Sequence, residues 1–412
     1  MAKNDSICAL DVGTSSVKAL ISEMHDGEVT VLGVGRAVSN GVRKGTVVNI
    51  DAAAAAIASA VEKAEIMAGG DVSRVVTSLG GDHLSGINSK GVIGVTARNR
   101  EITPFEVERV LESARSIRLP SDCEIIHLFP QEYAVDDHDE VRNPVGMTGA
   151  RLEAEAHIIT GMITNSDNLM RAIRKAGIEV DDVIASPYAA SYAVLTPDER
   201  ELGVALIDIG AATTSVMFFI EGAVTHTAVL PIGAQHVTSD ISMGLRISHT
   251  AAEEVKMSYG FAMSEMVSDT EAIEVPSTGD RPPRTIPKKT LSQIIEPRME
   301  EIFRLVLKEI EKVQCKEVLS AGAVLTGGGA MLGGATDVAE AVFGTMPARV
   351  GYPTGFSGML DIGRDATCAV AVGLTLMKSS EQNPAPGIRK VRERKEGNTG
   401  GKLSGWFKEF FS

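Results

Sequence analysis

Short apolar runs separated by glycine-rich turns make up the first part of the chain. They predict three strands, at about 6–12, 16–23 and 28–35, because runs of this length between turn residues are typical of strands in a sheet. An alanine-rich stretch at 51–68 follows and predicts a helix with Asp51 as its N-cap. The chain therefore begins as a mixed α/β unit.

The same three-strand pattern returns later, at about 203–209, 213–220 and 223–230. Residues 7–20 (ICALDVGTSSVKAL) and 204–217 (VALIDIGAATTSVM) share a buried strand that ends in Asp-Val/Ile-Gly, a hydroxyl-rich turn and a returning strand. The recurrence predicts two similar halves, each with an Asp and a glycine turn at the end of a strand.

A block with a different pattern lies between the two three-strand patterns. Residues 84–162 contain a helix at about 103–118 with strands on both sides, and they predict an inserted subdomain. After the second half begins, helices are expected at about 249–259 and 290–313. The polar stretch 379–402, rich in Pro, Gly and charge, predicts a linker.

A third glycine turn occurs at 323–332 (AVLTGGGAML), where a strand is followed by three glycines that open a helix. Gly327, Gly328 and Gly329 would let the backbone approach a ligand closely, and the helix N-terminus adds positive potential. A dinucleotide fingerprint is not matched, because Leu332 stands at its last glycine position, and no Walker A sequence occurs.

The two Asp-Gly turns are suited to phosphate groups. An Asp at the end of an apolar strand is costly to bury unless it meets a cation or hydrogen-bond donors. The Gly, Thr and Ser residues that follow offer N–H groups and hydroxyls to phosphate oxygens, while the Asp can hold a hydrated Mg2+. For one turn alone an ordinary hairpin remains the alternative, but two facing copies favour a phosphate site.

Composition excludes several classes of protein. The chain of 412 residues has 40 Lys and Arg against 54 Asp and Glu, and a formal charge of −14 argues against nucleic-acid binding through a general basic surface. Its 4 cysteines are far apart without a C-x-x-C pair, which favours reduced thiols. Neither a signal-peptide pattern nor an apolar run of membrane-spanning length is present, so we expect a cytoplasmic location.

Aromatic residues gather at the end of the chain. Only 11 Phe, 5 Tyr and 1 Trp occur in total, yet four of these lie within the last seven positions. The apolar positions there are spaced as one face of a helix: Leu403, Trp406, Phe407, Phe410 and Phe411. At about 1.5 Å per residue the segment is too short to cross a bilayer, and nearby basic residues favour an anionic membrane surface. A groove on the protein itself or on a partner is the alternative.

The three glycine motifs together resemble those of the actin-like ATPase superfamily in order and in wide spacing. Its two phosphate loops are similar to residues 7–18 and 204–215, and its adenosine loop to 324–332. Within the superfamily, several further segments resemble the FtsA family of bacterial cell-division proteins: 201–208 (ELGVALID), 226–240 (HTAVLPIGAQHVTSD), 281–284 (RPPR), 294–298 (IIEPR), the block 84–162 and the amphipathic C-terminus.

The resemblance implies an α/β, actin-like fold of two related halves around an ATP cleft, with an inserted α+β subdomain and a C-terminal amphipathic helix on a flexible linker. The implied subdomains are 1–83 and 163–200 (1A), 84–162 (1C, inserted), 201–240 and 321–378 (2A), 241–320 (2B, partner-binding), 379–402 (linker) and 403–412 (membrane-targeting helix).

The resemblance also implies ATP and Mg2+ as ligands. Asp11 and Asp208 would face Mg2+ through water. The phosphates would be surrounded by Gly13, Thr14, Ser15, Ser16, Lys18, Gly210, Thr213 and Thr214. Gly327, Gly328 and Gly329 would back the adenosine. Glu253 and Lys256, on one helix face, would contact the nucleoside, and a solvated salt bridge is the alternative for this pair.

Two departures from the pattern weaken any prediction of catalysis. Ala211 and Ala212 stand where strong ATPases of the superfamily commonly have glycines. Ser186 stands where related filament ATPases offer an acidic or amide side chain that positions water. We therefore expect ATP binding with weak or no ATPase activity, and no catalytic residue is assigned.

The implied function is in cell division. Such a protein would self-associate, bind the C-terminal tail of the tubulin-like FtsZ, and tether it as a peripheral protein to the cytoplasmic face of the inner membrane. Residues 241–320 would receive that tail, with Arg298 as an exposed candidate contact, and the inserted subdomain would meet later division proteins. An actin-fold phosphotransferase and a pilus-assembly adaptor are the alternatives.

Overall fold

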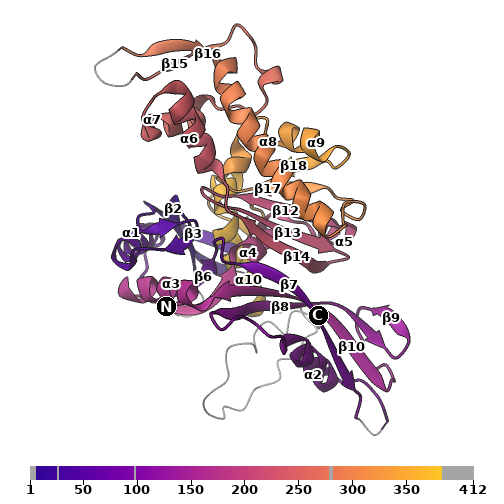
Figure 1. Cartoon of the computed structure of the whole chain (residues 1–412). Coiled ribbons are helices and arrows are strands. Elements are labelled where there is room, and N and C mark those ends of the chain that lie inside the picture. The colour runs from indigo at the N-terminus through magenta and orange to yellow at the C-terminus, as the bar shows by residue number, and fades with distance from the viewer. Residues whose placement is uncertain (1–5, 26, 97–98, 278–281, 383–412) are drawn as a thin grey trace.

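The computed structural model describes residues 6–25, 27–96, 99–277 and 282–382. Three larger sheets organise these residues and pack around three buried apolar clusters, the first of which includes residues of both halves. Two sheets belong to the two halves, and the third belongs to the inserted block (Figure 1). No helix in this part of the chain is long and apolar enough to span a membrane.

The first half is built on a six-stranded sheet with the order β11-β6-β1-β2-β3-β19. Its strands are β1 (Ser6–Val12), β2 (Ser16–His25), β3 (Glu28–Val38), β6 (Arg74–Leu79), β11 (Glu179–Ala185) and β19 (Phe356–Ser357). A small hairpin, β4 (Val42–Arg43) and β5 (Thr46–Val47), follows β3. The helices of this half are α1 (Ile50–Ala68), α3 (Ile163–Lys175), α4 (Ser186–Val194) and α10 (Ala369–Gln382).

Helix α1 lies unusually close to the first sheet because both surfaces have small side chains. A Cβ atom on Gly35 would lie 1.7 Å from the carbonyl oxygen of Ala60, so only glycine fits there. The expected helix at 51–68 is confirmed, but its N-cap is Asn49, whose side chain accepts the N–H of Ala52 at 3.1 Å.

The inserted block forms a four-stranded sheet with the order β7-β10-β8-β9, covered on one face by α2. Its elements are β7 (Ser85–Gly94), α2 (Pro104–Arg115), β8 (Cys123–Val135), β9 (His138–Val141) and β10 (Arg151–Met162). The capping box that opens α2 is present, since the Glu106 carboxylate accepts the backbone N–H of Thr103 at 3.1 Å.

The second half is built on a five-stranded sheet with the order β14-β13-β12-β17-β18. Its strands are β12 (Val204–Ile209), β13 (Thr214–Ile220), β14 (Ala223–Leu230), β17 (Ala323–Thr326) and β18 (Ala348–Val350). The helices around it are α5 (Pro197–Leu202), α6 (Ala234–Leu245), α7 (His249–Tyr259), α8 (Lys288–Lys312) and α9 (Ala335–Phe343), and β15 (Ala272–Val275) pairs with β16 (Arg284–Pro287).

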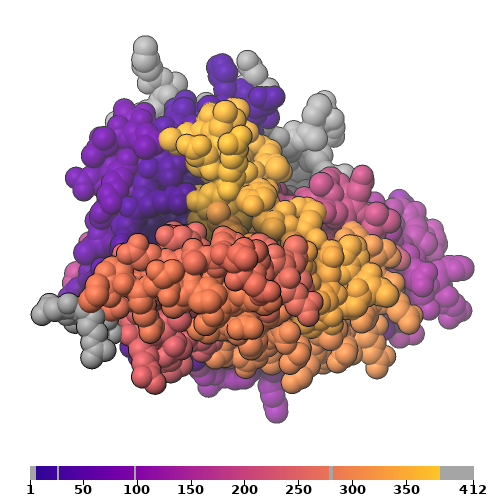
Figure 2. Space-filling model, turned by 90° about the horizontal axis from the view of Figure 1, so that it is seen from above, coloured from indigo at the N-terminus to yellow at the C-terminus, as the bar shows by residue number. Residues whose placement is uncertain are grey.

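The end of the described chain returns to the first half. The sequence analysis grouped 321–378 with the second half, whereas β19 pairs with β3 and the apolar face of α10 packs against α4 and β1. The physical reason is that α10 is buried along most of its length, which only a position between elements can provide. Figure 2 shows the yellow residues of this segment between the indigo first half and the orange second half. Helix α10 also runs to Gln382, beyond the expected start of the linker at 379.

Candidate functional site

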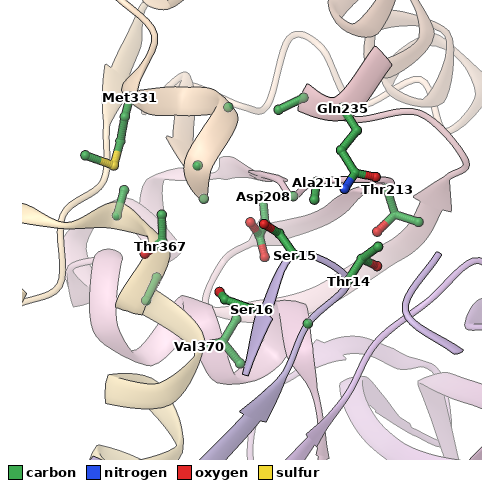
Figure 3. A pocket seen from close by; sticks show the side chains of 18 of the residues that line it. Thr14, Ser15, Ser16, Asp208, Ala211, Thr213, Gln235, Met331, Thr367 and Val370 are labelled. Atoms are coloured by element: carbon green, nitrogen blue, oxygen red, sulfur yellow. The ribbon is translucent and has the colours of Figure 1, made fainter. Parts of the chain in front are cut away.

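One cleft of about 680 Å³ lies between the two halves and is lined by all three glycine motifs. In Figure 3 the side chains of Thr14, Ser15 and Ser16 approach it from the first half, those of Ala211, Thr213 and Gln235 from the second, with Asp208 among them. Residues as far apart in the sequence as Asp11 and Val370 thus line one site.

The two Asp-Gly turns have the same backbone geometry. In the turn between β1 and β2, the N–H of Gly13 donates to the carbonyl of Ser16 at 3.1 Å. In the turn between β12 and β13, the N–H of Gly210 donates to the carbonyl of Thr213 at 2.9 Å. The internal repeat inferred from the sequence therefore extends to individual hydrogen bonds.

The first turn is braced from outside by the small hairpin that follows β3. The hydroxyl of Thr14 accepts the N–H of Gly45 at 2.8 Å, and the N–H of Ser39 donates to the carbonyl of Ser15 at 3.0 Å. These contacts hold the turn in place while the side chains of Ser15 and Ser16 line the cleft. A fixed turn of this kind offers its N–H groups to an anion without prior rearrangement.

The second turn differs from the prediction at one residue. Thr213 lines the cleft, but Thr214 is fully buried and its hydroxyl donates to the carbonyl of Ile232 at 2.8 Å. Thr214 therefore stabilises the turn from beneath and does not reach the cleft. The reason is strand alternation, because Thr213 precedes β13 whereas Thr214 is its first residue and points to the opposite face.

Two carboxylates lie at the floor of the cleft. Asp11 accepts the hydroxyl of Ser78 at 2.9 Å and lies 3.6 Å from the ammonium of Lys18. Burial, and secondly the neighbouring carboxylate of Asp11, raise the pKa of Asp208 to about 6, although Lys18 acts to lower it. Two carboxylates with one cation leave a local excess of negative charge, which a divalent cation would offset.

The third glycine motif touches this acidic floor directly. Gly327 has a φ of +80°, and a Cβ atom there would lie 2.2 Å from Oδ1 of Asp208. A Cβ on Gly329 would lie 2.3 Å from the side chain of Ile209. Glycine is therefore required both by the backbone conformation and by the close approach of β12.

Glu253 and Lys256 of α7 also line the cleft. The Lys256 ammonium lies 2.7 Å from the Glu253 carboxylate and donates to the hydroxyl of Thr238 at 2.8 Å. Burial acts to raise the pKa of Glu253, but hydrogen bonds from Lys256 and Thr238 outweigh it, and the pKa is lowered. Glu253 and Lys256 thus form a salt bridge, which the sequence analysis gave as the alternative to a nucleoside contact, and this salt bridge faces the cleft.

Several residues of the cleft were not foreseen from the sequence: Arg36, Gln235, His249, Met257, Met331, Asp365 and Thr367. Arg36 lies directly opposite Lys18 in the pairing of β2 and β3, and it forms an ion pair with Asp365 at 2.5 Å. The strand register could have placed Arg36 beside Lys18. Asp365 caps the short 3-10 helix Ala366–Cys368, which contains Thr367 and directly precedes α10. The apolar pattern of this stretch does not indicate which of its polar side chains face the cleft.

The residues that depart from the pattern of strong ATPases lie at or beside the cleft. Ser186 is the first residue of α4 and lines the cleft, and a Cβ on Gly80 would lie 2.8 Å from its hydroxyl. Ala211 lines the cleft and Ala212 is buried behind it. Gln235, on the first turn of α6, contributes a carboxamide from the opposite side.

Arg298, expected to be exposed, is instead held by neighbouring acids. Its guanidinium binds both carboxylate oxygens of Asp240, at 2.6 and 3.0 Å, and also pairs with Glu301. The hydrogen bonds from Arg298 to Asp240 are the main cause of its raised pKa. The reason is helix packing, which brings α6 and α8 together at this point. The amphipathic segment 403–412, in contrast, lies outside the described residues.

Comparisons with known proteins agree with this architecture. The family model described as "Cell division protein FtsA" matches residues 205–373, and that described as "SHS2 domain inserted in FTSA" matches 81–160. The cell division protein FtsA of Pseudomonas aeruginosa is 41% identical over 378 residues, covering 92% of this chain and 90% of the relative. That of Escherichia coli (strain K12) is 36% identical over 416 residues, covering 98% of both.

Solved structures with a similar fold are more distant in sequence. A "PilM-PilN type IV pilus biogenesis complex" covers 90% of this chain and 98% of the other, with a TM-score of 0.65 and 17% identity. MreB5 of Spiroplasma citri bound to ADP covers 93% and 100%, with a TM-score of 0.56 and 13% identity. The fold and the facing glycine turns define an actin-like protein with an SHS2 domain inserted in its first half.

Identity of 36–41% over nearly the whole length then settles the particular family. The chain belongs to the FtsA family of cell-division proteins, and the expected fold, inserted subdomain and family are confirmed.

Proposed function

We propose that the protein binds ATP with Mg2+ in the cleft between its halves. The observation that carries this proposal is the pair of matched turns, each after a strand that ends in Asp, that face one cavity. Fixed N–H groups and hydroxyls from both sides can surround a chain of phosphates, which neither half could do alone.

Different residues of the cleft would bind the cation, the phosphates and the nucleoside. Asp11 and Asp208 would hold Mg2+ through water, and the hydroxyl-rich turns and Lys18 would receive the phosphates. The Glu253–Lys256 pair would contact the nucleoside, and the glycines 327–329, which begin beside Asp208, would back the adenosine. Bound Mg2+ would supply positive charge between the phosphates and the two carboxylates.

Calorimetric titration of Mg-ATP tests the site. Asp208→Ala should weaken binding at least tenfold, about 1.4 kcal/mol, because the cation loses one of two carboxylates. The difference should shrink in EDTA, where no cation bridges the carboxylates to the phosphates. Asp71→Ala, at an exposed carboxylate outside the cleft, is the matched control. An isotherm unchanged by Asp208→Ala would remove this residue from the site.

Hydrolysis is proposed to be weak or absent. Ala211 restricts the approach of the second turn, and Ser186 has no acid or amide group with which to orient water. Steady phosphate release at about 1 per second or faster, without partners, would instead favour an ATPase or phosphotransferase enzyme.

We further propose that residues 241–320 receive the C-terminal tail of FtsZ and that the protein self-associates. The family membership supports this role, and the paired helices α6 and α8 offer a rigid surface for a peptide. At Arg298 a partner carboxylate would have to replace Asp240, so this residue is a weaker candidate than an unpaired arginine. The inserted subdomain is proposed to meet later division proteins.

The C-terminal segment is proposed to bind an anionic membrane surface. Five apolar side chains at about 1.5–3 kcal/mol each give on the order of 10 kcal/mol, and ordering ten residues costs a similar amount. One segment should therefore bind weakly, and several on one assembly should bind firmly. The protein would then lie at the cytoplasmic face of the inner membrane, at the division site.

A further inference from the structure

The inserted subdomain contacts both halves of the molecule, although its chain leaves and re-enters the first half. On the first-half side, Nε2 of His127 accepts the N–H of Ala185, the last residue of β11, at 3.0 Å. The ring of Phe129 lies 4.5 Å from that of Tyr188 in α4. On its other side, the edge strand β7 lies beside β14, the edge strand of the second half (Figure 1).

The contact with β14 is made by side chains and not by a strand ladder, since β7 and β14 belong to separate sheets. Three side chains form it: Asn88 Nδ2 donates to the carbonyl of Thr225 at 3.3 Å, Gln131 Nε2 donates to the carbonyl of Val224 at 3.0 Å, and His157 Nε2 lies 3.0 Å from the hydroxyl of Thr227.

This contact is closely fitted. A Cβ atom on Gly86 of β7 would lie 2.6 Å from the carbonyl of Thr227. His157 is only 1% exposed, and its second ring nitrogen lies 2.6 Å from Oδ1 of Asn88. Burial lowers the pKa of His157 to about 3, so its ring is neutral and depends on these two partners. A shift of β14 by about 1 Å away from β7 would take these donors and acceptors beyond hydrogen-bond distance.

The other end of β14 reaches the second phosphate turn. Leu230 of β14 pairs with Thr214, and Thr214 donates to the carbonyl of Ile232 just after the strand. Two residues later, the N–H of Ala234 donates to the carbonyl of Gly210 in the turn itself, at 2.9 Å. One strand thus joins the cleft to the inserted subdomain.

We propose that the inserted subdomain is coupled to the nucleotide cleft through β14, so that its contact with the second half depends on how far the cleft is closed. The inference rests on the proposed ATP site. Ligands bound between two domains commonly change the angle between them. Because the inserted subdomain is fixed to the first half by two chain connections and by the bond from Ala185 to His127, such a change must strain the β7–β14 contact.

The coupling is reciprocal by thermodynamic necessity. A nucleotide that alters the contact must itself bind with altered affinity when the contact is weakened. Whatever binds the inserted subdomain at this edge would then sense, and influence, the occupancy of the cleft some distance away. Binding of a partner to the inserted subdomain would then depend on whether nucleotide is bound in the cleft.

Hydrogen exchange of the full chain, with and without Mg-ATP, tests this inference. Exchange of the amides in 85–94 and 223–230 should differ at least threefold between the two conditions, because so close a fit can be kept at only one cleft width. Protection of 11–18 and 208–215 in the same samples shows that ATP is bound.

Two variants weaken the contact in different ways. Gly86→Val adds bulk where β7 meets β14. Asn88→Ala with Gln131→Ala adds no bulk and removes the two hydrogen bonds to β14, together with the one between Asn88 and His157. This second variant decides the test if Gly86→Val prevents folding. Each should abolish the ATP-dependent difference and change ATP affinity at least threefold. Gly94→Val is the matched control, since a Cβ there is 4.0 Å from its nearest neighbour.

Equal exchange of both strands with and without ATP, while the cleft amides become protected, overturns the coupling and leaves the ATP site standing. Absence of protection at the cleft itself, with no calorimetric binding, overturns the ATP site and the coupling with it.

Discussion

At the residue scale, glycine at the acidic floor of the cleft has two separable requirements. Gly327 has a φ of +80° and would place a Cβ 2.2 Å from the Asp208 carboxylate. Gly344 also has a positive φ, +79°, although its ψ is −102° and that of Gly327 is 175°, and nothing lies within 4 Å of its Cβ position. Both positions therefore disfavour a side chain through their backbone conformation, but only Gly327 adds steric contact with the site.

Substitution at these two glycines gives the corresponding prediction. Gly344→Ala should lower the free energy of unfolding by about 1–3 kcal/mol, from backbone strain alone. Gly327→Ala should cost more and should also abolish Mg-ATP binding, because the new methyl group displaces Asp208. Urea unfolding and calorimetry measure the two effects. Equal losses of stability in both variants, with ATP binding retained in Gly327→Ala, would contradict the role of this close approach.

Individual residues also mark the limit of what the sequence predicts. Asp11, Asp208 and the glycines could be found because strand-end Asp-Gly turns are a local pattern. Asp365 could not, because its ion pair with Arg36 at 2.5 Å joins positions 329 apart along the chain. Thr214 and Arg298 were misplaced for a related reason, since a side chain's direction and partners depend on packing between elements.

At the element scale, the strands and helices of both halves lie close to their predicted ranges because their apolar periodicity is strong. The exception is the position of α10, which packs against α4 and β1 of the first half. The resemblance implied that residues 321–378 belong to the second half, whereas the burial of α10 places this helix against the first. Propensity and pattern identify an element, but they do not determine which neighbour covers it.

The buried histidines of the inserted subdomain predict an acid-sensitive element. Burial lowers the pKa of His127 to about 4 and that of His157 to about 3, from an ordinary value of 6.5. As the pH falls, these histidines are protonated in the unfolded chain before they are protonated in the folded protein. The full stability of the folded protein is therefore present above pH 6.5, and part of it is lost progressively toward pH 4. For each of these histidines, the free energy of unfolding should fall by about 2 kcal/mol between pH 6.5 and pH 5.

Urea unfolding at pH 7.5 and pH 5 measures this effect. The His157→Gln variant, which cannot take up the proton, should lose about 2 kcal/mol less than the wild type over this interval. Neighbouring groups such as His226, with its Glu309 partner, remain in both proteins and cancel in the comparison. Identical pH dependence in wild type and variant would contradict a neutral, buried His157.

At the scale of the whole molecule, cleft and C-terminal segment are proposed to act together. In this proposal a single amphipathic segment would be too weak to anchor the protein by itself, and self-association of the nucleotide-binding part would bring several segments together. Trp406→Glu should reduce binding to anionic vesicles at least tenfold, because a charge enters the apolar face. Ser404→Glu adds the same charge outside that face and should have a much smaller effect. Co-sedimentation with vesicles compares them, and equal loss in both would indicate simple charge repulsion.

The most direct test of the whole account is vesicle co-sedimentation with and without Mg-ATP, for the full chain, for Asp208→Ala and for a chain lacking 403–412. The account predicts that Mg-ATP increases binding of the full chain, that Asp208→Ala loses this increase, and that removal of 403–412 abolishes binding. Equal binding by all three proteins, whether or not ATP is present, would contradict it.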